Sequence, residues 1–357
     1  MRDYTRKILY LGIDVHKASY SVTAICEGAV IKRDKLEASP QKLVDYCHRH
    51  FKGACIKSAY EAGFSGFYLH HFLIRNKIEN IVVHAASIAV SSRDLVKTDK
   101  RDSLKIASEL SANKLRPIHV PTIIRESKRN LTRLRETLVR QKTRTSCQIK
   151  SLLHLHGLMP LNKTDRVCKK WINDLENLKV DENLKYSLKV YAKTWGYFNL
   201  QLKKVDEAIK KQIHFDGGLT KIYCSVPGIG STAASILINE LGDTLQFSNE
   251  EKLFSHAGLT PREYSSGEHK RQGHITKQGK PILRRILIQA AWKAIKVDDS
   301  LAERFEQLKC RAGKKRAIVA IARLLLGRIR SCIKRKELYL VVKKEQPKQP
   351  QPDQQAI

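Results

Sequence analysis

The sequence predicts an α/β domain at the N-terminus, a basic helical middle region and a mainly α-helical C-terminal domain. Three strand-like runs, at 8–16, 19–26 and about 28–36, precede alternating helix and strand patterns. Three consecutive strands followed by helix, strand, helix and strand predict a mixed sheet with flanking helices. Residues 122–215 contain few glycines and are expected to be mostly helical, and long apolar helical patterns close residues 220–340.

Local signals predict the later elements of the N-terminal domain. Ser39 is a candidate N-cap before Pro40 at the first helical position, and Leu43, Val44 and Cys47 form a helical apolar stripe. The segments that follow are a strand in ACIKSAYEAG, a helix in GFYLHHFLIRNK and a strand in NIVVHAA. These signals complete the α/β pattern.

The charge of the chain indicates a polyanionic partner. Its 357 residues include 67 Lys and Arg against 35 Asp and Glu, a net charge of +32. Solubility does not need so much charge, so nucleic acid is the expected partner. An anionic membrane is the competing interpretation, but the sequence has no secretory signal, no spanning apolar run and no lipidation motif. The eight cysteines form no C-x-x-C pair, which favours reduced thiols in a cytoplasmic protein over disulfides or a zinc site.

The middle region combines a basic surface with an apolar stripe. Residues 125–150 contain nine Lys or Arg and two Glu. A heptad seam starts at Leu131, Leu134 and Leu138, and continues through polar residues before Leu152. This pattern predicts a coiled-coil-like helix with a polar middle, which could be a helical hairpin, a dimer interface or a basic helix on nucleic acid.

Four carboxylates form the first chemical constellation. Asp14 interrupts the first predicted strand, and an ionised carboxylate in a dry interior is unfavourable unless it is paired or binds a metal. Glu61 ends a later strand, while Asp99 and Asp102 share one face of a helix that Thr98 would cap. Taken alone, Asp99 and Asp102 are explained by the usual preference for acidic residues in the first turn of a helix. Glu61 alone is explained as a loop carboxylate in a salt bridge. Together they suit a pair of Mg²⁺ ions for phosphoryl transfer on DNA.

The segment YCSVPGIGSTAASILINELGD is the second signal. Gly228 and Gly230 permit a tight turn between two helices, as in a helix-hairpin-helix element. The free amides near Ser231 could bind a DNA phosphate. The alternative is a glycine loop needed only for close helix packing.

The third signal is a basic segment that contains two serines, GLTPREYSSGEHKRQGHITKQGKPILRR. Ser265 and Ser266 lie among the following basic residues: Arg262, His269, Lys270, Arg271, Lys277, Lys280, Arg284 and Arg285. Composition favours a flexible basic loop on nucleic acid. A serine could instead act as a nucleophile on a phosphate that the cations hold.

These motifs together resemble a known family. Asp14 in GIDVHK, Glu61 in YEAG, the pair in KTDKRD, then VPGIG and the basic serine segment are similar to the DEDD transposases of insertion-sequence family 110. The resemblance is collinear over roughly residues 8–335. The chain departs from the family pattern just after Glu61 and at Ser103, and neither departure removes a proposed ligand.

The resemblance implies a domain organisation. It assigns a RuvC-like, RNase-H-fold DEDD domain to 1–120 and a basic helical or coiled-coil linker to 121–215. It assigns a transposase domain with a catalytic serine to 216–342, and a disordered tail to 343–357.

The resemblance also implies a reaction. Family members excise and insert their own element as tetramers, and a bridge RNA pairs with the donor and target double-stranded DNA. Ser266 would attack the DNA phosphate and form a covalent link, with Ser265 as the alternative nucleophile. The metal ligands carried over by position, for two Mg²⁺ per site, are Asp14, Glu61, Asp99 and Asp102. A prokaryotic, nucleoid-associated cytoplasmic enzyme is expected.

Further expectations concern contacts and rival functions. The residues expected to contact nucleic acid are Gly228, Gly230, Ser231, Arg262, Lys270, Arg271, Lys277 and Arg284. One rival is a RuvC-like junction endonuclease that uses a metal and water and needs no serine. The other is a non-enzymatic, basic nucleic-acid-binding protein. The role of His16, which shares a strand face with Asp14, is open.

Overall fold

The computed structural model describes residues 4–85, 88, 99–158, 167–212, 218–266 and 269–343. The chain divides into two compact units, Met1–Pro121 and Thr122–Ile357. Each unit has its own hydrophobic core. The expected cap Thr98 and the expected tail from residue 344 onward lie outside the described residues.

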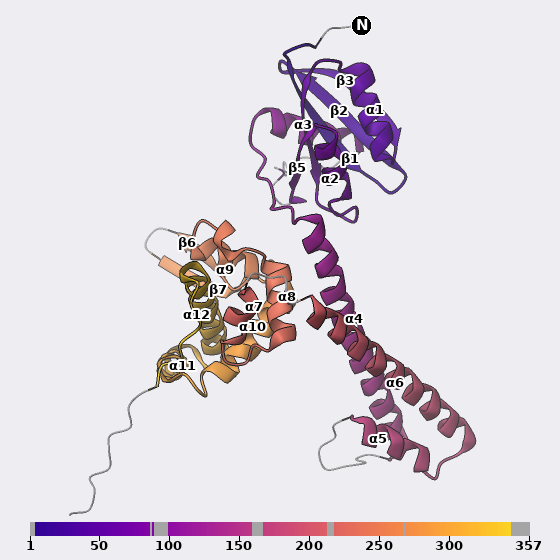
Figure 1. Cartoon of the computed structure of the whole chain (residues 1–357), viewed down its shortest axis with the longest axis vertical. Coiled ribbons are helices and arrows are strands. Elements are labelled where there is room, and N and C mark those ends of the chain that lie inside the picture. Colours follow the sequence, from indigo (N-terminus) through magenta and orange to yellow (C-terminus); the bar gives the residue numbers. More distant parts are fainter. Residues whose placement is uncertain are drawn as a thin grey trace, which may run out of the picture. The chain divides into compact units, whose positions relative to one another are not determined.

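The first unit is a five-stranded mixed sheet with flanking helices, as the sequence predicted (Figure 1). Its strands are β1 (Ile8–Val15), β2 (Ser19–Cys26), β3 (Ala29–Glu37), β4 (Cys55–Glu61) and β5 (Glu79–Val83). Their order is β3-β2-β1-β4-β5, with antiparallel pairing from β3 to β1 and parallel pairing from β1 to β5. This arrangement fits an RNase-H-like α/β fold.

Two helices cover one face of this sheet. They are α1 (Pro40–His50) and α2 (Tyr68–Arg75). Ser39 caps α1, because its side chain accepts a hydrogen bond from the backbone N–H of Lys42, as predicted. Leu9 and Leu11 of β1 are fully buried in the core that both helices share with the sheet.

The opposite face of the sheet is covered by α3 (Asp99–Ser111). Gly12 of β1 lets this helix come close, since a Cβ there would lie 2.2 Å from the carbonyl oxygen of Ser103 and 2.4 Å from the nitrogen of Ala107. The Ser103 hydroxyl is 2.9 Å from that of Thr23, which pairs with Gly12 across β1 and β2. The turn from Ser103 to Ala107 is therefore seated directly on β1.

The second unit begins with two long helices, α4 (Ile123–Leu155) and α6 (Glu182–Lys211), that pack against each other (Figure 1). Between them are α5 (Lys169–Asp174) and the 3₁₀ turn η2 (Leu175–Asn177). The predicted heptad seam is wrong at Leu134, whose exposed fraction is 47%. The buried stripe of α4 instead follows Thr132, Leu138, Thr145, Ile149 and Leu153. A straight helix drifts from a strict heptad, so the buried positions shift along its surface.

The remaining elements form a mainly helical core. They are α7 (Leu219–Cys224), α8 (Ser231–Leu241), η4 (Thr244–Gln246), α9 (Glu250–Ala257), β6 (Pro261–Ser266), β7 (His269–Ile275), α10 (Pro281–Ala294), α11 (Asp299–Ala312) and α12 (Lys314–Arg335). Leu237, Leu287 and Leu325 are fully buried at its centre. In the described ranges, no helix is long and apolar enough to cross a membrane.

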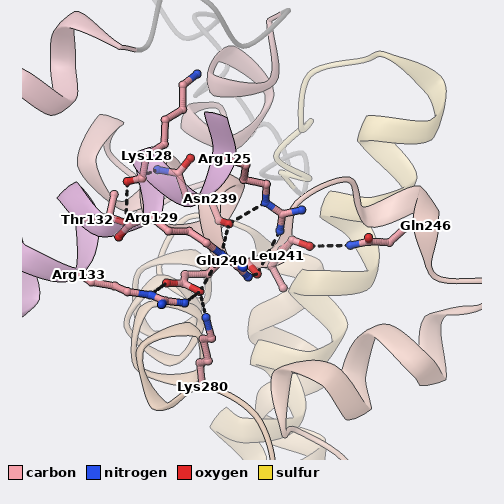
Figure 2. Close-up of polar contacts among 10 residues, drawn as sticks. All are labelled: Arg125, Lys128, Arg129, Thr132, Arg133, Asn239, Glu240, Leu241, Gln246 and Lys280. Atoms are coloured by element: carbon pink, nitrogen blue, oxygen red, sulfur yellow. Dashed lines mark hydrogen bonds and ion pairs between the residues drawn. The ribbon is translucent and has the colours of Figure 1, made fainter. Parts of the chain in front are cut away.

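An arginine cluster fixes α4 to the C-terminal end of α8 (Figure 2). The Nε atoms of Arg125 and Arg129 each donate to the carbonyl oxygen of Asn239, at 2.9 and 3.0 Å. Arg133 binds the carboxylate of Glu240 with two hydrogen bonds, at 2.8 and 3.2 Å, and Lys280 binds the same carboxylate. The last carbonyls of a helix carry partial negative charge, so these cations suit the position.

The environment of Glu240 keeps its side chain ionised. Burial by itself would raise the pKa of this carboxyl, but hydrogen bonds from Arg133 and Lys280 outweigh burial and lower the pKa to about 2. Because the folded-state pKa is below the ordinary value of 4.5, the ion pairs stabilise the fold above about pH 4.5. That stabilisation is lost as the pH falls toward 2.

We expect Gly12→Ala to destabilise the first unit, because the added methyl group meets the backbone of α3. Overpacking of this kind lowers the free energy of unfolding by about 1–3 kcal/mol. Urea unfolding, with amide exchange of peptides from β1 and α3, measures the effect. Gly63→Ala is the control, since its Cβ would meet nothing nearer than 4.0 Å. Equal unfolding midpoints for Gly12→Ala and the wild type would contradict the close approach.

We expect Glu240→Gln to destabilise the second unit by about 1–3 kcal/mol at neutral pH, because it removes the buried carboxylate that pairs with the partly exposed cations Arg133 and Lys280. The difference in free energy of unfolding between wild type and variant should shrink as the pH falls from about 4.5 to about 2. Denaturant unfolding over that pH range measures it, with exposed Glu207→Gln as the control. A difference that does not change with pH would refute the ion-pair account.

Candidate active site

Asp14 and Glu61 lie on neighbouring parallel strands. The paired register of β1 and β4 ends at Ile13 and Tyr60, so the two carboxylates are the next residues on their strands. Glu61 also pairs with Val83 of β5, which is buried against α3. Side chains alternate along strands, so Asp14 shares a face with Gly12, the residue that α3 contacts. Both carboxylates therefore belong to the face that α3 covers.

Asp14 is partly buried and has a close partner. Its side chain is 19% exposed, and its Oδ2 lies 2.9 Å from Nε2 of His16. Asp14 is the last residue but one of β1, so the expectation of a carboxylate deep inside a strand is too strong. His16, whose role the sequence left open, contacts the carboxylate directly.

The third and fourth carboxylates come from the start of α3. Asp99 is the first residue of the helix and Asp102 lies one turn later, directly before the buried Ser103. The Asp102 side chain is partly exposed, and the side chain of Asp99 lies outside the described part of the structure. The contact at Gly12 thus brings the first turn of α3 to the face that holds Asp14 and Glu61.

This donor set fits a hard divalent cation. Carboxylate oxygens are the ligands that Mg²⁺ and similar ions prefer, and two of them here are supplied by adjacent strands. Among the described side chains, which exclude that of Asp99, no three acidic, His or Cys residues are grouped closely enough to hold a metal.

The two candidate serines lie on a β-hairpin. Ser265 and Ser266 end β6 and pair with Lys270 and His269 of β7. The composition-based expectation of a flexible loop is wrong here, because the backbone from Pro261 to Ile275 is mostly a paired two-stranded ladder. The side chains of both serines, and of Lys270 and Arg271, lie outside the described part.

Tight backbone packing anchors the base of the hairpin. Gly258 and Gly279 both have positive φ, and a Cβ on either would lie about 2 Å from a carbonyl oxygen, at 1.9 Å and 2.2 Å respectively. Nη1 of Arg284 donates to the carbonyl oxygen of Gly279 at 3.1 Å and approaches that of Ala257 at 3.4 Å. Arg284, predicted to contact nucleic acid, is thus engaged at the hairpin base. Lys277 and Arg262 are exposed beside it.

The glycine loop between α7 and α8 has a clear packing role. A Cβ on Gly228 would lie 2.8 Å from the Cβ of Lys293 and 3.0 Å from the Cα of Ala290, both on α10. Gly230 is the N-cap of α8 and has open space around it, and Ser231 is the first helical residue. Phosphate binding at this helix start stays a prediction.

Sequence reasoning missed Glu240 and Lys280 as a pair. Lys280 lies directly before α10, at the end of the chain segment that leaves the serine hairpin, and its ammonium binds Glu240. The available signal was a single carboxylate at the end of the apolar helix SILINEL. The cluster links the hairpin base to α8 and α4 (Figure 2).

Comparisons with known proteins agree with this architecture. Residues 11–158 match a family model for the DEDD transposases of IS110, described as "Transposase". Residues 220–306 match a second model, described as "Transposase IS116/IS110/IS902 family". The first model covers the carboxylate face and α4, and the second covers the glycine loop, the serine hairpin and α10.

Several relatives carry related names. A putative transposase, y4rJ, from Sinorhizobium fredii is 29% identical over 293 residues, 74% of each chain. The transposase for insertion sequence element IS1111A from Coxiella burnetii is 26% identical over 254 residues, 68% of each chain. The transposase for insertion sequence element IS1328 from Yersinia enterocolitica is 27% identical over 203 residues, 56% of this chain and 60% of the relative. With both family models matched in order along one chain, this protein belongs to the IS110 family of DEDD transposases, which are enzymes that act on DNA.

Proposed function

We propose that this transposase excises and inserts its own element by Mg²⁺-dependent strand cleavage and a covalent serine–DNA intermediate, guided by RNA. One observation carries the proposal: Asp14 and Glu61 are neighbours on parallel strands, on the face where α3 brings in Asp99 and Asp102. The match of the DEDD model to the same residues supports it.

The carboxylates hold the catalytic cations in this proposal. Asp14, Glu61, Asp99 and Asp102 would bind two Mg²⁺, and His16 would orient Asp14 through the 2.9 Å contact. When bound there, such ions would supply Lewis-acid stabilisation of the charge on the phosphate oxygens. Asp14 and Glu61 are held on neighbouring strands, which limits the reorganisation of these two carboxylates when DNA binds.

Ser266 supplies the nucleophile. Its Oγ bonds to the phosphorus as its proton leaves to solvent or a neighbouring base. The bond from phosphorus to one deoxyribose oxygen breaks, and that oxygen takes up a proton. Attack by the hydroxyl of another strand reverses these steps and frees the serine, so strands exchange without an external energy source. The hairpin carries this serine at its tip, and exposed basic residues such as Arg262 lie toward its base.

The partners follow from charge and family. A net charge of +32 suits extended contact with donor and target DNA and with a bridge RNA. We assign the enzyme to the prokaryotic cytoplasm as a nucleoid-associated tetramer with a coiled-coil linker, and Arg262, Lys270, Arg271 and Lys277 to phosphate contacts. The proposal includes the domain bounds: a DEDD domain at 1–120, a linker at 121–215 and a transposase domain at 216–342.

We expect Asp14→Asn and Glu61→Gln each to reduce Mg²⁺-dependent strand cleavage by at least about 10²-fold, since each removes charge that holds the cations. Cleavage of labelled element-end DNA by the full chain with its RNA measures this. Asp45→Asn, on the exposed side of α1, is the matched control. Full activity in both variants would contradict the carboxylate site, and no cleavage by wild type would favour a non-enzymatic binding protein.

A further inference from the structure

One face of α6 carries exposed aromatic and apolar side chains. Tyr186, Val190, Tyr197 and Leu200 are 71%, 46%, 57% and 51% exposed. Their spacing of four, seven and three residues places them on one side of the helix. The opposite side, with Leu184, Leu188 and Trp195, is buried. A contiguous row of large exposed apolar and aromatic side chains is unfavourable in water and marks an interaction surface.

The charges along the row between its ends are all positive, while Glu182 and Glu207 lie one to two turns beyond it. The segment 185–204 contains no Asp or Glu, and its lysines are all exposed: Lys185, Lys189, Lys193, Lys203 and Lys204. Lys189 lies three residues after Tyr186, and Lys193 lies four residues before Tyr197, so each tyrosine has a lysine beside it on the surface. We call these five lysines with Tyr186, Val190, Tyr197 and Leu200 the tyrosine–lysine stripe.

A glycine at the centre of the stripe is a second observation. Gly196 lies in the middle of α6, where glycine destabilises a helix by about 1 kcal/mol relative to alanine. A Cβ there would meet no atom within 4 Å, so packing within the chain does not require the glycine. The glycine leaves open surface beside Tyr197. The Tyr197 ring contacts the ring of Phe198 edge to face, with the centroids 5.8 Å apart. The arrangement leaves room for a flat group to approach.

We propose that the tyrosine–lysine stripe binds single-stranded nucleic acid, with bases stacked on Tyr186 and Tyr197 and phosphates held by the lysines. Aromatic rings interleaved with cations are the usual means of binding unpaired strands. A rise of 1.5 Å per residue puts the two tyrosines about 16 Å apart, so one strand of a few nucleotides can reach both. The inference goes beyond strand cleavage and does not rest on it.

Charge complementarity selects this occupant over a second copy of the chain. Two copies meeting through the stripe would bring like charges together, which disfavours association. A polyanion relieves the repulsion between the lysines, and its bases cover the apolar surface. Duplex DNA offers phosphates but no free base faces, so it would use the lysines alone.

The test compares stripe variants of the full chain for binding to fluorescent oligouridylate and oligothymidylate. We expect Tyr186→Ala with Tyr197→Ala to weaken binding of at least one probe by more than about tenfold. The paired Phe substitutions keep a stacking surface and should bind as wild type does. The two probes decide between RNA and DNA as the strand.

Two results would overturn the proposal. One is unchanged affinity of the double alanine variant for both probes, with helix content equal to wild type by circular dichroism. The other is a change in oligomeric state, measured by sedimentation, in the same variant without any change in probe affinity, because that would assign the stripe to contacts between copies. Photocrosslinks from the probe to peptides containing Tyr186 or Tyr197 in the wild-type chain would support it without any substitution.

Discussion

The packing of α3 on the carboxylate face depends on glycine, which has no side chain, at position 12. Gly12 allows the backbone of α3 to rest on β1, with the carbonyl of Ser103 and the nitrogen of Ala107 in the space that a Cβ would fill. The Thr23–Ser103 hydrogen bond fixes the helix along the strand. Because Asp14 lies two residues beyond Gly12, this single contact decides whether carboxylates from strand and helix can act together.

A second constraint acts in the other unit. The carboxylate of Glu240 pairs with Arg133 and Lys280 at the end of α8. Arg125 and Arg129 donate to the backbone carbonyl of Asn239 at the same helix end. Lys280 follows the segment that leaves the serine hairpin, so the same cluster that fixes α4 also restrains the hairpin base. Glu240 is the one buried carboxylate of the cluster, so its removal takes the counter-charge from Arg133 and Lys280 together.

Sequence patterns predicted the sheet and its helices well because alternating apolar residues and the Ser39 cap are local signals. They also singled out Asp14, because a charge within an apolar strand demands a partner, and its side chain does contact His16. Metal binding by the four carboxylates stays a prediction. The sequence patterns failed where distant segments decide the outcome. The close approach of α3 to Gly12 and the pairing of Glu240 with Arg133 each join residues far apart in the chain. No local sequence pattern predicts such contacts.

Covalent trapping tests the central claim most directly. The purified chain is incubated with its element's RNA, Mg²⁺ and labelled DNA, denatured, and examined for label on the protein. We predict a labelled adduct that Ser266→Ala abolishes and Ser265→Ala retains, with the label mapped by mass spectrometry to the end of β6. Cut DNA without any adduct would contradict the serine mechanism and indicate that water is the nucleophile.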